Sequence, residues 1–174
     1  MNITVRQEVK RDYAVVFEIN KAAFEQNEEA ELVDALRKSK AFIPELSLVA
    51  VAGCKAVGHI LFTKAIIKNE SGEEFESLAL APMAVHPDFQ MAGIGSKMIN
   101  YGLDKGRELG FKSVTVLGHD MYYPKFGFMP ASNWNIRVPF DVPENIFMAI
   151  ELTPGGLDGV SGIVHYADEF QSVC

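Results

Sequence analysis

The sequence predicts a single α/β (α+β) domain, residues 1–174, with a mixed, mostly antiparallel central sheet flanked by helices. Apolar and alternating runs between residues 46 and 85 are interrupted by turn signals at 53–55 and 69–72, which is the pattern of consecutive hairpins. A strand–helix–strand unit follows at residues 74–117 and is typical of a parallel crossover. The length fits one domain, and no repeat or linker divides the chain.

The composition excludes several classes of protein. With 16 Lys and Arg against 23 Asp and Glu, the net charge is −7, which argues against a general nucleic-acid partner. An aromatic content of 10% and a mean hydropathy of +0.07 exclude a disordered chain. No run of 18 apolar residues indicates a membrane span, and the first 13 residues contain no signal-peptide stretch. Cys54 and Cys174 lack metal-ligand spacing, so we expect no metal and free thiols in the cytoplasm.

The N-terminal quarter is expected to form one strand and two helices. Residues 2–7 alternate apolar and polar side chains, as in a half-buried strand. The first helix, which Asp12 is expected to cap, has one apolar face: Tyr13, Val16, Phe17 and Phe24. Residues 28–38 form the second predicted helix, because acidic residues begin it and basic residues end it, as the helix dipole prefers.

The rest of the chain is expected to be rich in strands. Strands are predicted at residues 46–52, 56–68 and 74–85. A helix is predicted at residues 93–109, and the next strand at 111–117. Beyond them we expect a short helix or turn at 122–126 and strands near 134–138, at 146–152 and at 163–166.

The most informative stretch, VHPDFQMAGIGS, joins the strand ending at Val85 to the helix starting at Gly93. Backbone N–H groups are free at a helix N-terminus, and the helix dipole adds positive potential. No capping side chain directly precedes Gly93, so a bound phosphate would fill that role. The stretch lacks the lysine of a Walker loop, and Met98 stands where a dinucleotide fingerprint has its third glycine. A tight turn that uses glycine for packing remains an alternative.

One face of the following helix is unusually rich in glycine. Gly95, Ile99, Gly102 and Gly106 are spaced four, three and four residues apart. Each glycine weakens a helix by about 1 kcal/mol relative to alanine. We therefore expect close packing of this face on the sheet, although simple tolerance of glycine in a buried helix is the alternative.

Two motifs resemble those of a known family. Gln90-x-x-Gly93-x-Gly95, after the strand, is similar to the acyl-CoA-binding motif of the GNAT N-acetyltransferase superfamily. The stretch YPKFGF that begins at Tyr123 resembles the Tyr-x-x-x-Gly-Phe signature that follows the next strand in that family. The likeness extends over nearly the whole chain, toward a bacterial subgroup of predicted acetyltransferases. It implies that the parallel strands splay apart near Val85 and Leu117.

The resemblance implies acetyl-CoA as co-substrate, held in the gap between the splayed strands without a metal. The residues it places at this ligand are Met83, Ala84, Val85, Gln90, Met91, Ala92, Gly93, Ile94, Gly95, Ser96, Leu117, Gly118, Tyr123 and Phe126. The acetyl group would pass to a primary amine, on a small molecule, a protein N-terminus or a lysine, by direct attack in a ternary complex. No nucleic acid or membrane is implied as a partner; a homodimer is an open expectation, because similar proteins are often dimers.

Tyr123 occupies the position of the general acid in similar enzymes. Its phenol has an ordinary pKa of about 10, near the 8.5 of a thiol, so the two groups can share a proton. The alternative is that Tyr122 and Tyr123 are core aromatics. For the general base, His119 and Glu29 are candidates, with Glu28 beside the latter, and a water chain to a remote carboxylate is also open.

Two other functions remain open at this point. The chain would be a catalytically inactive CoA-binding sensor or scaffold if it kept the phosphate-binding loop and had lost turnover. The loop would instead hold another phosphate ligand, such as a nucleotide, if the resemblance were misleading. Transfer to any amine would exclude the inactive sensor, and tight CoA binding without transfer would favour it. Binding of ATP or NAD in place of acetyl-CoA and CoA would indicate another phosphate ligand.

Overall fold

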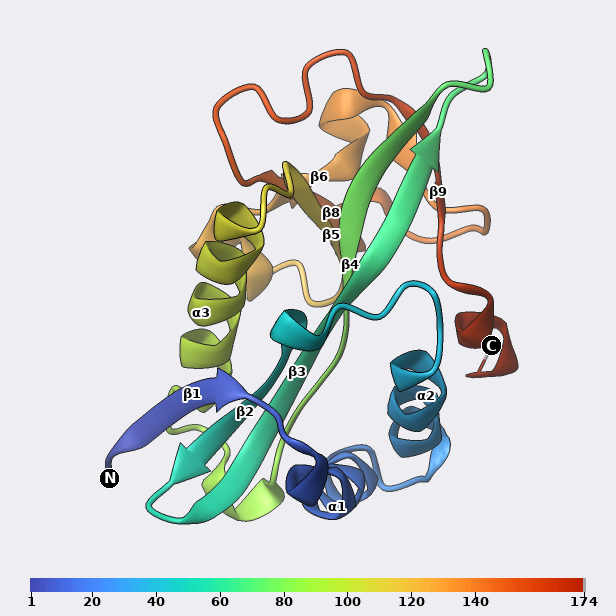
Figure 1. Cartoon of the computed structure of the whole chain (residues 1–174). Coiled ribbons are helices and arrows are strands. Elements are labelled where there is room, and N and C mark those ends of the chain that lie inside the picture. The colour runs from blue at the N-terminus through green and yellow to red at the C-terminus, as the bar shows by residue number, and fades with distance from the viewer. Residues whose placement is uncertain (174) are drawn as a thin grey trace.

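The computed structural model describes residues 1–173 of the chain, and Cys174 lies outside them. Within these residues, nine strands form one sheet in which β1-β2-β3-β4-β5-β8-β6 are neighbours in that order. Strand β9 pairs with both β3 and β7. Helix α3 lies on one side of the long β3–β4 ribbon, and α1 and α2 lie on the other (Figure 1).

The first four strands form the predicted antiparallel meander. They are β1 (Ile3–Gln7), β2 (Ser47–Ala52), β3 (Lys55–Lys68) and β4 (Glu74–Val85). Their ends agree with the predicted bounds to within one residue. The agreement follows from local signals, since the turn residues Gly53 and Gly72 both adopt the positive φ that glycine allows without strain.

The parallel crossover is also confirmed. It runs from β4 through α3 (Ile94–Glu108) to β5 (Ser113–Leu117). Only two register pairs join the strands, Leu78 with Val114 and Ala79 with Thr115. Because β4 continues to Val85 without β5 beside it, the two strands part after Ala79, as the resemblance implied.

The C-terminal part completes the sheet with short strands. They are β6 (Met129–Pro130), β7 (Ile136–Arg137), β8 (Phe147–Glu151) and β9 (Gly162–His165). The strand expected near residues 134–138 is only two residues long, because a 3₁₀ turn (Ala131–Trp134) and a left-handed Asn135 precede it. The two-residue β6 was not predicted, because it has no pattern of its own and depends on β8.

Helices α1 (Tyr13–Phe24) and α2 (Glu28–Arg37) form as expected, with two corrections. Asp12 precedes α1, but its side chain does not cap that helix; it accepts hydrogen bonds from Val9 N, at 2.7 Å, and from Arg6. The expected apolar face was wrong at its ends, since Tyr13 and Phe24 are each 37% exposed. The buried residues of α1 are Val16, Ile19 and Asn20.

The side chains of β3 alternate between two cores. Ile60 and Phe62 pack with α3, while Leu61 packs with α1 and α2. Two glycines of α3 face the sheet: a Cβ at Gly102 would lie 2.2 Å from the Phe62 ring, and one at Gly106 would lie 3.2 Å from Leu78. The predicted close approach of this helix to the sheet is therefore confirmed.

A buried polar cluster lies where α2 meets the edge of the sheet. Arg37 donates two hydrogen bonds to Glu8, at 3.0 and 2.8 Å. Ser47 Oγ donates to Glu8 at 2.6 Å and lies 3.0 Å from His59 Nε2. Since the serine proton goes to Glu8, His59 must carry its proton on Nε2, and its Nδ1 is buried without a partner.

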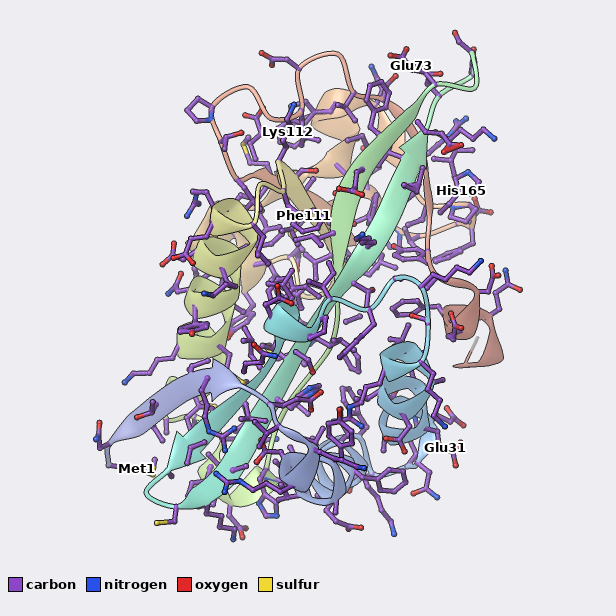
Figure 2. The ribbon with its side chains drawn as sticks, viewed as in Figure 1. Met1, Glu31, Glu73, Phe111, Lys112 and His165 are labelled. Atoms are coloured by element: carbon purple, nitrogen blue, oxygen red, sulfur yellow. The ribbon has the colours of Figure 1, made fainter. Side chains whose placement is uncertain are left out.

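Several segments outside the sheet lie at the surface of the molecule. Phe111 and Lys112 lie in the turn between α3 and β5, and Glu31 lies on the outer side of α2 (Figure 2). The C-terminal 3₁₀ segment η7 (Asp168–Val173) lies beside α2 (Figure 1). In the part of the chain described, no helix has the length and apolar character needed to span a bilayer.

Candidate functional site

The loop between β4 and α3 ends in a set of free backbone donors. Gln90 shapes the loop by donating its side-chain amide to Val85 O at 3.0 Å, and Gly93 adopts a φ of +77° at the N-cap. The first hydrogen bond of the helix is donated by Lys97 to Gly93 O. The amides of Ile94, Gly95 and Ser96 precede it and have no partner within the helix. These three donors and the helix dipole together suit an anion.

The space in front of this helix end is open. A Cβ added at Gly93 would meet nothing within 4 Å, and no side chain caps the helix. An ordinary buried turn would place protein atoms there, because unpaired amides away from water are costly. The arrangement therefore leaves room for a ligand at the amides.

A bulge in β4 opens the sheet beside the loop. Ile60 pairs with Met83 and Phe62 with Leu80, so Ala81 and Pro82 together face the single residue Leu61. The Ala81–Pro82 peptide bond is cis. An extra residue in one strand bends that strand locally. The bulge begins two residues after Ala79, where pairing with β5 stops.

A cavity of about 800 Å³ occupies this gap and extends to both ends of it. The loop and the start of α3 form one end, and the facing parts of α1, α2 and η7 form the other. Its lining residues are Phe24, Glu29, Leu32, Leu80, Ala81, Pro82, Met83, Val85, Phe89, Gln90, Met91, Gly93, Ile94, Gly95, Ser96, Leu117, Gly118, His119, Tyr122, Tyr123 and Phe170. Its size is ample for a ligand of several fused or linked groups.

Tyr123 lines the cavity from its inner wall and is only 7% exposed. Its ring packs edge-on against Phe128, at 5.6 Å between centroids, and lies over Gly118, where a Cβ would come within 2.3 Å of it. Its hydroxyl has no hydrogen-bond partner among residues 1–173. Burial, with a smaller effect from Tyr122, raises the pKa of Tyr123 to about 12. The group therefore stays protonated at neutral pH and has a hydrogen bond to donate into the cavity.

Tyr122 also lines the cavity, on the side of the helix end. Its ring packs edge-on against Phe126 at 5.3 Å. Its Oη lies near the first turn of α3, since a Cβ at Gly95 would be only 2.9 Å from it. The two tyrosines are therefore packed aromatics and cavity-lining groups at once, and the alternatives weighed from the sequence do not exclude each other.

Both candidates for the general base lie on the cavity wall, at different places. His119 is exposed and follows β5. Glu29 is half-buried at the start of α2, and Gln26 Nε2 donates to both of its carboxylate oxygens, at 2.9 and 3.1 Å. Glu28 is exposed and lies outside the lining of the cavity.

Most residues expected at the ligand come together around this cavity, and three do not line it. Ala84 is buried against α1 and α2, Ala92 is exposed in the loop, and Phe126 packs behind Tyr122. Sequence reasoning missed other lining residues: Phe24, Leu32, Leu80, Ala81, Pro82, Phe89, Tyr122 and Phe170. Among residues 1–173, no three His, Cys, Asp or Glu side chains are grouped so as to hold a metal ion.

The sequence matches the model of an acetyltransferase family. The model of the Acetyltransferase (GNAT) family matches residues 13–128, more than half of the chain, and the chain belongs to that family. Among curated relatives it is 40% identical over 136 residues to an uncharacterized N-acetyltransferase, YjhQ, of Escherichia coli strain K12, covering 78% of this chain and 75% of the relative.

Two solved structures share the fold over nearly their whole length. One is the GNAT family N-acetyltransferase YhbS from Escherichia coli in complex with CoA, with a TM-score of 0.89 and 28% identity over 98% of this chain and 93% of the other. The second is a GNAT family acetyltransferase from Brucella melitensis in complex with acetyl-CoA, with a TM-score of 0.79 and 33% identity over 97% and 98%. Both comparisons include the C-terminal strands beyond residue 128.

Proposed function

We propose that residues 1–174 form one acetyl-CoA-dependent N-acetyltransferase domain that acetylates a primary amine by direct attack in a ternary complex. The observation that carries the proposal is the single cavity in which free helix amides, the gap between β4 and β5 and the Tyr123 hydroxyl meet. The two related structures, which hold CoA and acetyl-CoA, support it. The exposed free thiol of Cys54 supports a reducing, cytoplasmic compartment.

The proposed ligand fits both parts of the gap. The amides of Ile94, Gly95 and Ser96 would hold the pyrophosphate, where the helix dipole stabilises negative charge. Beyond Ala79, one edge of β4 faces no neighbouring strand. Backbone groups of an unpaired edge bind extended amide-containing chains, so the residues around Met83 to Val85 would hold the pantetheine arm. Acetyl-CoA then supplies the activated acetyl thioester at the bulge.

Tyr123 would act on the leaving sulfur. A thiol has a pKa of about 8.5 and the Tyr123 hydroxyl one of about 12, so complete transfer of its proton to the thiolate is uphill by about 5 kcal/mol. We therefore assign Tyr123 the task of donating a hydrogen bond that stabilises the developing thiolate. The ammonium of the acceptor must lose one proton before attack, and its nitrogen loses a second proton as the C–S bond breaks and the amide forms. The CoA thiolate gains one proton, so the overall reaction releases one proton. His119 or Glu29 would take the first proton.

Calorimetric titration with acetyl-CoA tests the binding half of the proposal, with CoA, ATP and NAD as comparisons. The wild type should bind acetyl-CoA and CoA selectively. Gly93→Val should abolish binding, because the added side chain enters the open space at the amides. Gly53→Val is the matched control: Gly53 also has a positive φ and open space around it, but it lies in a turn outside the cavity. Normal affinity in Gly93→Val would refute the proposed phosphate site.

Release of free thiol from acetyl-CoA in the presence of amines tests the chemical half. Transfer to any amine supports an enzyme. Tight binding of CoA with no transfer over a broad panel of amines would favour the inactive CoA-binding sensor or scaffold instead. Binding of ATP or NAD in place of CoA would exclude both.

A further inference from the structure

The cavity has a second half that the proposed CoA site does not use. Phe24 ends α1, Glu29 and Leu32 belong to α2, and Phe170 belongs to η7. These elements pack on the face of the sheet opposite α3, while the free amides belong to α3 itself. The bulge in β4 lies between the two halves. A second substrate reaching the bulge from this side would meet the acetyl group without crossing the phosphate site.

The wall of this half is mainly apolar. Phe24 is 37% exposed, although its ring would be expected inside a core. Leu32 is buried against the sheet, and Phe170 packs against the ring of Tyr166 at 5.5 Å. Apolar side chains around a concave surface favour a ligand that buries apolar atoms against them. A strongly hydrated ligand would lose water there without gaining partners.

One charge is present on this wall. Among residues 1–173, Glu29 is the only carboxylate that lines the cavity, and no lysine or arginine of this range lines it. Gln26 holds both of its oxygens, which still have lone pairs to accept from an ammonium. Leu32 follows Glu29 by three residues, so on a helix the carboxylate and the apolar side chain share one face. A single carboxylate beside apolar groups matches a ligand with one ammonium and an apolar body.

We propose that the acceptor is a primary monoamine with an apolar body, whose ammonium is held by Glu29 and whose body packs on Phe24, Leu32 and Phe170. This assignment rests on the proposed acetyltransferase function and names its substrate class. Polyamines and aminoglycosides carry several ammonium groups and would need several carboxylates on the wall. A lysine in a polar peptide would leave the apolar side chains uncovered.

The first test is an acceptor panel at saturating acetyl-CoA, with thiol release as the readout. Phenylethylamine and hexylamine represent the proposed class; spermidine, kanamycin and a lysine-containing polar peptide represent the others. We expect kcat/KM to be at least tenfold higher for the first two amines. A preference for spermidine or kanamycin, or for the peptide, would overturn the assignment.

Paired variants test the residues. Glu29→Gln should raise the KM for phenylethylamine at least tenfold and leave the Kd for acetyl-CoA unchanged. Glu31→Gln is the matched control on the same helix, because Glu31 lies on its outer side (Figure 2). Phe24→Ala should likewise raise KM, whereas Phe140→Ala should not, since Phe140 is exposed at a separate depression. An effect of Glu29→Gln on kcat with an unchanged KM would show that Glu29 does not anchor the ammonium.

A binding measurement keeps this inference separable from the proposed function. Phenylethylamine is titrated into the protein saturated with CoA, or into the protein alone if CoA does not bind. Binding that Glu29→Gln weakens at least tenfold supports the acceptor site even where no transfer occurs. Equal binding by the two proteins overturns it even where acetyl-CoA is turned over with other amines.

Discussion

Acid should destabilise this fold through the buried imidazole of His59. The ring is fully enclosed, its Nε2 donates to Ser47, and a proton added at Nδ1 would find no hydrogen-bond acceptor. Burial is the largest cause that lowers the pKa of His59, to about 4, although the nearby Glu8 opposes the shift. The 3.6 Å contact between His59 and Glu8 is therefore not an ion pair at neutral pH.

The sign and size of the effect follow from linkage. Between pH 6.5 and 4 the unfolded chain binds a proton at this histidine and the folded protein does not. The stability contributed by neutral His59 is therefore complete above pH 6.5 and is lost as the pH falls toward 4. A shift of one pKa unit corresponds to 1.36 kcal/mol, so the loss at pH 4 amounts to about 3 kcal/mol.

Urea unfolding at half-unit pH steps from 7 to 4 measures this loss, with the fluorescence of the single tryptophan as the signal. The variant His59→Gln keeps a side-chain amide that can donate to Ser47 but has no titratable ring. The difference in unfolding free energy between wild type and variant should shrink by about 3 kcal/mol from pH 7 to pH 4. The carboxylate of Glu8 is present in both proteins. Burial would raise its pKa, but the hydrogen bonds from Arg37 and Ser47 and the charge of Arg37 lower it overall.

Parallel stability curves for the two proteins over this pH range would refute the reasoning. They would mean that the folded protein accepts a proton at His59 as readily as the unfolded chain does. Such a result would require a partner for Nδ1, most simply an enclosed water.

Three further changes test the site and its support. Tyr123→Phe should lower kcat about tenfold to a hundredfold, measured by thiol release, because the hydrogen bond donated to the thiolate is lost. The acetyl-CoA Kd should stay within twofold by calorimetry. An unchanged kcat would show that Tyr123 does not stabilise the thiolate. Gly118→Ala should lower kcat in the same assay, because its Cβ would displace the Tyr123 ring, and wild-type activity would contradict that packing. Gly102→Ala should destabilise the fold by about 1–3 kcal/mol in urea unfolding, because the clash with Phe62 outweighs the gain of about 1 kcal/mol in helix propensity; a stabilised variant would contradict it.

Local signals in the sequence predicted the elements that form the proposed phosphate site. Glycine turns delimited β2, β3 and β4, and the glycine-rich stretch before Ile94 marked the free helix end. The glycines of α3 predicted its close contact with the sheet, because close packing was the simplest gain that could offset their cost in helix stability. Each of these features depends on residues near one another in the chain.

The features that the sequence did not predict depend on contacts between residues far apart in the chain. Asp12 has the side chain of a helix cap, but Arg6 and Val9 N compete for it more effectively. Phe24 has the position of a core residue in its helix, and only the folded chain shows that it faces the cavity instead. Phe170 lies in a C-terminal segment without periodicity, and its place beside α2 follows from tertiary packing alone.

The short contact between β4 and β5 has a thermodynamic consequence for the whole protein. The first four strands pair with β5 through two register pairs, at Leu78 and Ala79. A ligand lying along the gap would contact both β4 and β5 and so stabilise their association. At a concentration of 100 times its Kd, a ligand that binds only the folded state adds about 2.7 kcal/mol to stability. For a chain of this length that raises the midpoint of thermal unfolding by about 5–10 °C. Under the proposed function, the concentration of acetyl-CoA would thus set the folding stability of the protein as well as its rate of turnover.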